Sequence, residues 1–116
     1  MRVVRVQILK TQAVIADECF VAESVLERTR GLIGRKGLEP GQAMLFPNCN
    51  SIHMWLMGFS IDVVFIREGR VSSVHADVRP WKLFPLLDWR GKDALELPSG
   101  TIRRLDISRG DELCIS

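Results

Sequence analysis

The chain has 116 residues, of which 47% are hydrophobic and 26% are charged. This composition excludes a disordered, collagen-like or coiled-coil protein. The length favours a single domain over residues 1–116, with one hydrophobic core. The 16 Lys and Arg against 14 Asp and Glu give a net charge of +2, and so nearly balanced a charge predicts neither a nucleic-acid nor a membrane partner.

The cysteine pattern and the absence of targeting signals indicate the compartment. Cys19, Cys49 and Cys114 form no C-x-x-C motif, and three cysteines cannot all pair within one chain. The sequence has no signal-peptide pattern and no run approaching the roughly 20 apolar residues of a membrane span. We therefore expect reduced thiols in a cytoplasmic protein.

Short apolar runs predict most of the secondary structure. They are separated by turns rich in Gly, Pro and Asp about every 8–12 residues, as in all-β barrels and sandwiches. A strong hairpin turn is expected over 67–70, and a single helical turn over 101–105. The expected strands are 3–9, 13–16 and 18–22 (as one strand or two), 43–46, 51–57, 61–66, 71–78, 94–97 and 112–115. The pattern predicts a mainly β fold, a compact barrel or sandwich of short, mostly antiparallel strands.

One longer helix is predicted in the N-terminal half. Ser24 and Glu27 have the S-x-x-E spacing of a capping box. Apolar residues then recur at helical intervals along one stripe. The pattern predicts an α-helix over about 24–34, with Gly34 or Gly37 supplying its stop.

A series of short motifs, in a fixed order, resembles one known family. The motifs are Gly31-Leu32-Ile33-Gly34-Arg35, Met44-Leu45-Phe46, Cys49-Asn50-Ser51-Ile52-His53, Met57, Ile61-Asp62-Val63-Val64-Phe65, Arg79-Pro80-Trp81, Leu95-Glu96-Leu97-Pro98-Ser99-Gly100-Thr101 and Arg109-Gly110-Asp111. They resemble domain-of-unknown-function family 192, a group of small bacterial and archaeal proteins, over about residues 22–115. The resemblance implies a compact, mainly β domain with one N-terminal helix and no established activity.

Two positions depart from the pattern of that family. Met54 stands where a small hydroxyl residue, usually Thr, is common, and Gly58 stands where a longer, often basic residue is common. If that basic residue binds a ligand in other members, this chain has lost or altered the contact.

Three residues are candidates for acid/base chemistry, because they interrupt otherwise apolar strands. They are His53, Asp62 and Glu96. A buried carboxylate needs partners, since otherwise its pKa rises. With a two-residue connection between their strands, His53 and Asp62 share a face; with a three-residue connection they point to opposite sides. The alternative role for Asp62 is structural, as an acceptor for backbone amides.

Four further residues are candidates for ligand binding. They are Arg30, Met57, Arg79 and Trp81. Pro80 holds the residue before it extended, and the Trp ring offers a flat amphipathic surface. The aromatic-rich stretch that continues to Trp89 is either a ligand surface or a loop folded back over the sheet. Glu96 points opposite to its apolar neighbours, either into a polar cluster with Arg79 or Arg30 or into water.

Cys49 and His53 form a C-x3-H pair of possible metal ligands. Zinc needs about four protein ligands in a structural site and three in a catalytic one. We therefore predict no metal site and no cofactor. A nucleophilic Cys49 with His53 as its base is a further alternative.

These features favour a binding module over an enzyme. The ligand is a small polar molecule or a protein segment, held on one face near His53, Met57, Asp62, Arg79, Trp81 and Glu96. The competing hypothesis is a hydrolase or lyase that uses His53 with Asp62 or Glu96. We expect a monomer or a weak homo-oligomer, and a purely structural domain with an aromatic contact between copies is the third possibility. The 12 arginines are scattered along a sequence without Tyr, so no nucleic-acid partner is expected.

Overall fold

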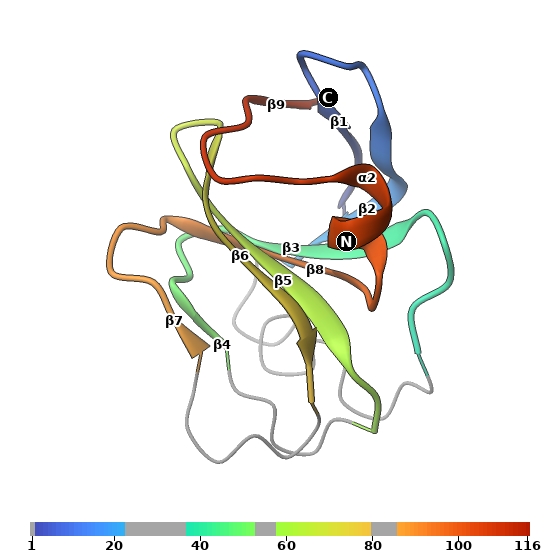
Figure 1. Ribbon diagram of the computed structural model, residues 1–116, viewed down its shortest axis with the longest axis vertical. Coiled ribbons are helices and arrows are strands. Elements are labelled where there is room, and N and C mark those ends of the chain that lie inside the picture. The colour runs from blue at the N-terminus through green and yellow to red at the C-terminus, as the bar shows by residue number, and fades with distance from the viewer. Residues whose placement is uncertain (1, 23–36, 53–57, 80–85) are drawn as a thin grey trace.

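Seven strands form one curled sheet (Figure 1). The computed structural model describes residues 2–22, 37–52, 58–79 and 86–116. In chain order the strands are β1 (Arg2–Ile8), β2 (Val14–Val21), β3 (Gln42–Phe46), β5 (Ile61–Arg67), β6 (Arg70–Val78), β8 (Asp93–Pro98) and β9 (Leu113–Ile115). Their order in the sheet is β6-β5-β8-β3-β2-β1-β9. A separate two-stranded sheet pairs β4 (Ser51–Ile52) with β7 (Leu86–Leu87), and α2 (Thr101–Leu105) follows β8.

The hairpin between β5 and β6 is built by local sequence. Arg67 pairs with Arg70 across a two-residue turn. Both turn residues have positive φ, 51° at Glu68 and 77° at Gly69. This is the type I′ geometry that matches the twist of the flanking strands, and Gly adopts its second position without strain. The predicted hairpin turn is confirmed.

Of the two possibilities for 13–16 and 18–22, the structure has a single strand, β2, with an irregularity in its pairing with β1. Val4 of β1 pairs with Cys19, whereas Val6 pairs with Ala16. Two residues of β2 therefore stand opposite one residue of β1, which is the definition of a β-bulge. The bulge accommodates the polar Asp-Glu step without ending the strand.

Both faces of the central strands are buried. All residues of β5 from Ile61 to Ile66 are inaccessible to solvent, as are the middle residues of β8. Alternate side chains enter two apolar clusters, one containing Val64 and Leu95 and the other containing Val63 and Phe65. The first cluster also draws on β1, β9 and α2, so it fills the inside of the curl. The second covers the opposite face of the sheet.

The two edges of the curled sheet meet at the β5–β6 turn. Arg70 forms an antiparallel bridge with Glu112, just before β9. The amide of Val71 donates to the carbonyl of Asp111 at 2.8 Å, and the amide of Leu113 donates to the carbonyl of Gly69 at 2.7 Å. β9 also pairs with β1 at the other edge of the sheet. These bonds therefore join the two edges at this point and nearly close the sheet into a barrel. We call this junction the seam.

The predicted mainly β fold is confirmed. The predicted helical turn over 101–105 is also confirmed, as α2. Among the strands that the structure describes, all pairs are antiparallel except β2 with β3, which is parallel. The expected helix over about 24–34 and most of the expected strand over 51–57 lie outside the described residues. None of the described helices is long and apolar enough to cross a membrane.

Candidate functional site: an arginine pocket at the seam

Asp62, near the start of β5, is a fully buried carboxylate that binds three backbone amides. Its Oδ1 accepts a hydrogen bond from the amide of Asp77 at 2.8 Å. Its Oδ2 accepts from the amides of Gly100 and Ile102, at 3.1 and 2.8 Å. The carboxylate thus ties β5 to the end of β6 and to the start of α2. The structural role that the sequence left open for Asp62 is confirmed.

Glu96, in the middle of β8, is buried and is not hydrogen-bonded through Oε2 to any residue that the structure describes. It lies between Met44 of β3 and Val63 of β5 in the sheet. Burial raises the pKa of Glu96 from 4.5 to about 8, because an apolar environment disfavours the charged form. Glu96 therefore does not face water, and that expectation is wrong; the alternative of a polar cluster with Arg30 lies outside the described residues.

Asp62 and Glu96 do not form one site. In the antiparallel pair of β5 with β8, Asp62 stands opposite Leu97 and Val63 stands opposite Glu96. Side chains of paired residues share a face, and neighbours along a strand point to opposite faces. Asp62 is therefore on the inner face of the curl and Glu96 is on the other. The expectation that one face carries both carboxylates is wrong, because adjacent positions in a strand register cannot share a face.

Arg79 lies at the surface beside Asp77. Its Nε is 3.3 Å from Asp77 Oδ2, and its side chain is 79% exposed. Asp77 Oδ1 in turn accepts a hydrogen bond from Ser99 Oγ at 2.9 Å. Among the described residues, Arg79 therefore has Asp77 as its carboxylate partner, and the expected contact with Glu96 is not formed.

The other predicted site residues are only partly described. Cys49 is half-buried, and its Sγ donates a hydrogen bond to the carbonyl of Ser51 at 3.1 Å. Within the described ranges, no group of three or more His, Cys, Asp or Glu is placed to hold a metal ion. The remaining candidates, Arg30, His53, Met57 and Trp81, lie outside the described residues.

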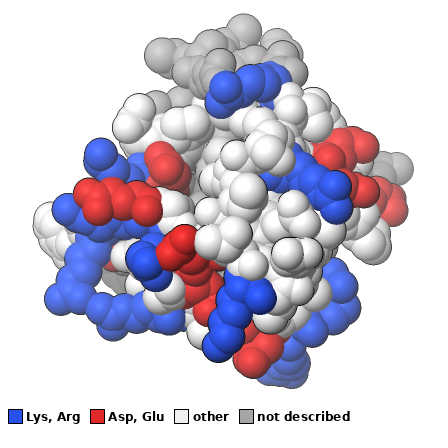
Figure 2. Space-filling model, turned by 90° about the horizontal axis from the view of Figure 1, so that it is seen from above, with Lys and Arg blue, Asp and Glu red and all other residues white. Residues whose placement is uncertain are grey.

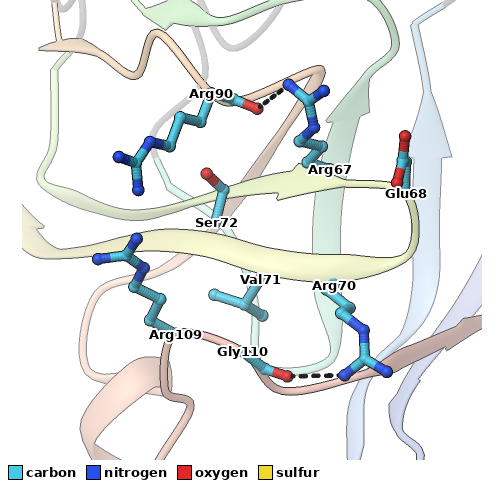
Figure 3. Close-up of a pocket in the computed structure, with 8 residues that line it drawn as sticks. All are labelled: Arg67, Glu68, Arg70, Val71, Ser72, Arg90, Arg109 and Gly110. Carbon is cyan, nitrogen blue, oxygen red and sulfur yellow. Dashed lines mark hydrogen bonds between the residues drawn. The ribbon is translucent and has the colours of Figure 1, made fainter.

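A pocket of about 300 Å³ at the seam gathers four arginines (Figure 3). The pocket, here called the arginine pocket, is lined by Arg67, Glu68, Arg70, Val71, Ser72, Arg90, Arg109 and Gly110. The arginines come from three separate segments. One pair flanks the β5–β6 turn, one residue lies in the loop between β7 and β8, and one precedes β9. The closing of the seam is what brings these segments together.

Two of the four guanidinium groups are held by the protein itself. Arg67 donates to the carbonyl of Arg90 at 3.4 Å, and Arg70 donates to the carbonyl of Gly110 at 3.3 Å. Arg70 also forms an ion pair with Glu112 at 2.6 Å. These contacts bind the loop and the segment before β9 to the hairpin, so they fix the walls of the pocket.

The other two guanidinium groups, those of Arg90 and Arg109, have no hydrogen-bond or ion-pair partner among the described residues. Figure 3 shows them approaching the same end of the pocket from either side of the hairpin. Two unpaired cations in one cavity repel each other, and an anion placed between them removes that repulsion. This end of the pocket is therefore suited to an anionic group.

A second pocket of about 270 Å³ adjoins the first. It shares Ser72, Arg90 and Arg109 with the arginine pocket, and it adds Ser73, Leu87, Asp88 and Trp89. We call it the Trp89 pocket. Trp89 is 85% exposed, so the possibility that this loop folds its aromatic residues back over the sheet is excluded for Trp89.

Asp88 holds the loop that carries Trp89 and Arg90. Its Oδ2 accepts from Ser73 Oγ at 2.7 Å, and its Oδ1 accepts from the amide of Arg90 at 2.9 Å. Desolvation opposes the ionisation of Asp88, but hydrogen bonds from Ser73, Ser72 and the following amides outweigh it and lower the pKa of Asp88. The ionised carboxylate thus positions the loop between the two pockets.

Gly91, which closes this loop, allows it to pack on the core. A Cβ at this position would lie 3.1 Å from Cβ of Phe65 and 3.3 Å from the carbonyl oxygen of Asp88. Phe65 is fully buried and has little freedom to move. We expect Gly91→Ala to lower the free energy of unfolding by about 1–3 kcal/mol, measured by urea denaturation. A variant as stable as the parent would contradict the tight packing of this loop.

The sequence reading missed the arginine pocket because the four arginines are far apart in the chain. The conclusion that the arginines are dispersed, with no basic patch, is wrong for this group. Figure 2 shows basic side chains gathered on the left of the view from above, the side on which Figure 1 places the β5–β6 turn and the loop before β8. The one available signal was that Arg67, Arg70 and Arg109 all flank predicted turns.

Fold and pocket together define a small, mainly β protein with a curled seven-stranded sheet and an arginine-lined seam. The model of the family DUF192, described as "Uncharacterized ACR", matches residues 6–115. The chain therefore belongs to the DUF192 family, which confirms the resemblance found in the sequence.

Two curated proteins are similar to this chain in sequence. A UPF0127 protein of Thermococcus sibiricus is 30% identical over 97 residues, which are 80% of this chain and 62% of that protein. A UPF0127 protein of Thermococcus gammatolerans is 28% identical over 78% of this chain and 61% of its own length. The chain thus spans about three-fifths of the length of these relatives.

Two solved structures are similar to nearly the whole chain. A protein of unknown function from Novosphingobium aromaticivorans has a TM-score of 0.81 and 24% identity, covering 97% of this chain and 83% of that one. A putative transcription regulator from Sinorhizobium meliloti has a TM-score of 0.79 and 27% identity, covering 96% and 90%. The first of these likenesses concerns the fold alone.

Proposed function

We propose that the protein is a binding module for a small anion, which it holds in the arginine pocket. One observation carries the proposal: Arg90 and Arg109 enter one pocket of about 300 Å³ without a carboxylate partner among the described residues. Ligand pockets of this kind have volumes of about 300–1,000 Å³ and a few converging polar groups. The arginine pocket is at the small end of that range, which suits a compact ligand.

Arginine is the side chain best suited to oxyanions. Its planar guanidinium presents paired N–H donors that match the spacing of phosphate and carboxylate oxygens, and it stays charged at any physiological pH. The positions of Arg90 and Arg109 on a loop and a segment fastened to the hairpin reduce the entropy lost on binding. Phosphate is the candidate we favour, because its oxygens match the paired N–H donors of a guanidinium group and it carries between one and two negative charges near neutral pH.

The acidic residues at the pocket do not neutralise it. Glu68 lies in the exposed hairpin turn, and Glu112 pairs with Arg70. Asp88 accepts hydrogen bonds from Ser73 and from its own loop. The carboxylates of Asp88 and Glu112 are satisfied by the protein, and Figure 3 shows Glu68 at the end of the pocket away from Arg90 and Arg109. The charge offered to a ligand between those two arginines is therefore their own.

The test is binding of inorganic phosphate and pyrophosphate, measured by isothermal titration calorimetry at low ionic strength. Charged hydrogen bonds contribute about 1.5–3 kcal/mol, so Arg90→Gln or Arg109→Gln is expected to weaken binding by at least roughly tenfold. Affinity should also fall as salt rises, because the contact is between exposed charges.

The matched control is Arg104→Gln, which removes the same charge from the exposed side of α2. This variant should bind as the parent does. The proposal fails if neither anion binds, or if the three substitutions weaken binding equally, since the effect would then be one of net charge.

A further inference from the structure

We infer that the anion bound by this module is the phosphate of a nucleotide, whose base stacks on Trp89. This inference rests on the proposed function and adds the chemical class of the ligand. It is carried by the Trp89 pocket, which adjoins the arginine pocket and shares three residues with it.

Trp89 is highly exposed. With 85% of its surface in water, this large ring contributes almost nothing to the core. Contact of so large an apolar surface with water is unfavourable, so a ligand that covers the ring gains affinity. Leu87, two residues earlier, is 45% exposed and lines the same pocket. The side chains of Leu87 and Trp89 give this pocket an apolar surface beside Arg90 and Arg109.

The loop that carries Trp89 is held in place by hydrogen bonds. The carbonyl of Asp88 accepts a hydrogen bond from the amide of Gly91 at 3.0 Å. The Asp88 carboxylate binds Ser73 on β6 and the amide of Arg90. Trp89 therefore sits between anchored residues, so covering its ring costs little ordering of the backbone.

Charge sets the direction of the ligand. Arg90 and Arg109 line both pockets, whereas Asp88 and Trp89 line only the Trp89 pocket. A phosphate is attracted to the place where Arg90 and Arg109 converge, and the Asp88 carboxylate repels it from the rest of the Trp89 pocket. A flat, uncharged ring is suited to the Trp89 end, where the carboxylate can also accept from its amino or imino groups. A phosphate joined to a flat ring that carries hydrogen-bond donors describes a nucleotide.

Nucleotides reach a protein either free or within a single strand of nucleic acid, and both sources present this chemistry. Stacking on an aromatic side chain tolerates any base, because every base has a π-face. The site as described therefore selects for a phosphate and a ring, and the source is decided by experiment.

The test compares adenosine 5′-monophosphate with ribose 5-phosphate, which has the phosphate but no base. Calorimetry should give roughly tenfold tighter binding for the nucleotide, the size expected for one stacked base. Trp89→Leu, which keeps an apolar side chain without a ring, should abolish that difference, whereas Trp89→Phe should retain most of it. Ribose 5-phosphate should bind the parent and both variants equally.

Each outcome distinguishes this inference from the proposed function. If the two phosphates bind equally, or if Trp89→Leu leaves their ratio unchanged, the nucleotide inference is overturned while anion binding stands. If neither phosphate binds the parent, both fail. A short oligothymidylate that binds more tightly than the mononucleotide, with the same dependence on Trp89, supports the inference and identifies a strand as the source; no such gain supports it with a free nucleotide as the source.

Discussion

Replacing Asp62 by Ala is expected to lower the free energy of unfolding by about 3–5 kcal/mol, because three amides lose their common acceptor. The amides of Asp77, Gly100 and Ile102 all donate to this carboxylate. A buried N–H without an acceptor costs about 1–3 kcal/mol. Since a domain of this size has a total stability of about 5–15 kcal/mol, the variant should be close to unfolding at room temperature.

Urea denaturation followed by circular dichroism measures this loss, and two further variants interpret it. Asp62→Asn keeps one acceptor oxygen and should recover only part of the stability. Its side-chain NH2 group would replace the other oxygen and leave at least one backbone N–H donor without an acceptor. Asp106→Asn changes the same functional group at an exposed position after α2, where Asn tolerates the left-handed conformation, and should have little effect. Equal losses in Asp62→Ala and Asp106→Asn would contradict the structural role of Asp62.

The second large effect is a pH dependence caused by Glu96. Burial raises the pKa of Glu96 in the folded protein from 4.5 to about 8. Well below pH 4.5 the folded and unfolded chains both hold the proton, and Glu96 adds nothing to the pH dependence of stability. Above that pH the unfolded chain releases the proton while the folded chain retains it, so stability falls by about 1.4 kcal/mol per pH unit until about pH 8. The total loss is on the order of several kcal/mol.

Glu96→Gln keeps the shape of the side chain and removes its titration. The difference in free energy of unfolding between this variant and the parent, measured by urea denaturation from pH 5 to pH 8, should therefore grow in favour of the variant as the pH rises. All other titrating groups are present in both proteins, so their contributions cancel when the two free energies of unfolding are subtracted. A difference that is constant over this range would show that Glu96 is already ionised at pH 5, which the buried position of its Oε2 without a described partner argues against.

Local sequence patterns predicted the elements of this fold but not their neighbours. Short apolar runs bounded by turn residues located β5, β6 and β8, and the segment from Arg67 to Arg70 located the hairpin turn, whose two central residues have positive φ in the structure. The parallel pairing of β2 with β3 and the bridge from Arg70 to Glu112 join residues far apart in the chain. Such pairings depend on which faces are already buried, and a period of two along each strand does not contain that information.

The candidate site was hidden from sequence reasoning for the same reason. Polar residues in apolar strands drew attention to Asp62 and Glu96, and both proved to be buried on opposite faces of the sheet. Arg90 and Arg109 were unremarkable residues in turns, which most often face water. They became a candidate site only because the seam brings two turns and a loop to one place.

The anion-binding claim is tested most directly on the arginine side chains of the unmodified protein. Nuclear magnetic resonance resolves the Nε–Hε group of each arginine, and a titration with inorganic phosphate reports which of them bind. We predict that the signals of Arg90 and Arg109 shift together and saturate with one dissociation constant, while those of Arg103 and Arg104 on α2 stay in place. Small shifts of equal size in all four signals, without saturation, would contradict the arginine pocket as a binding site.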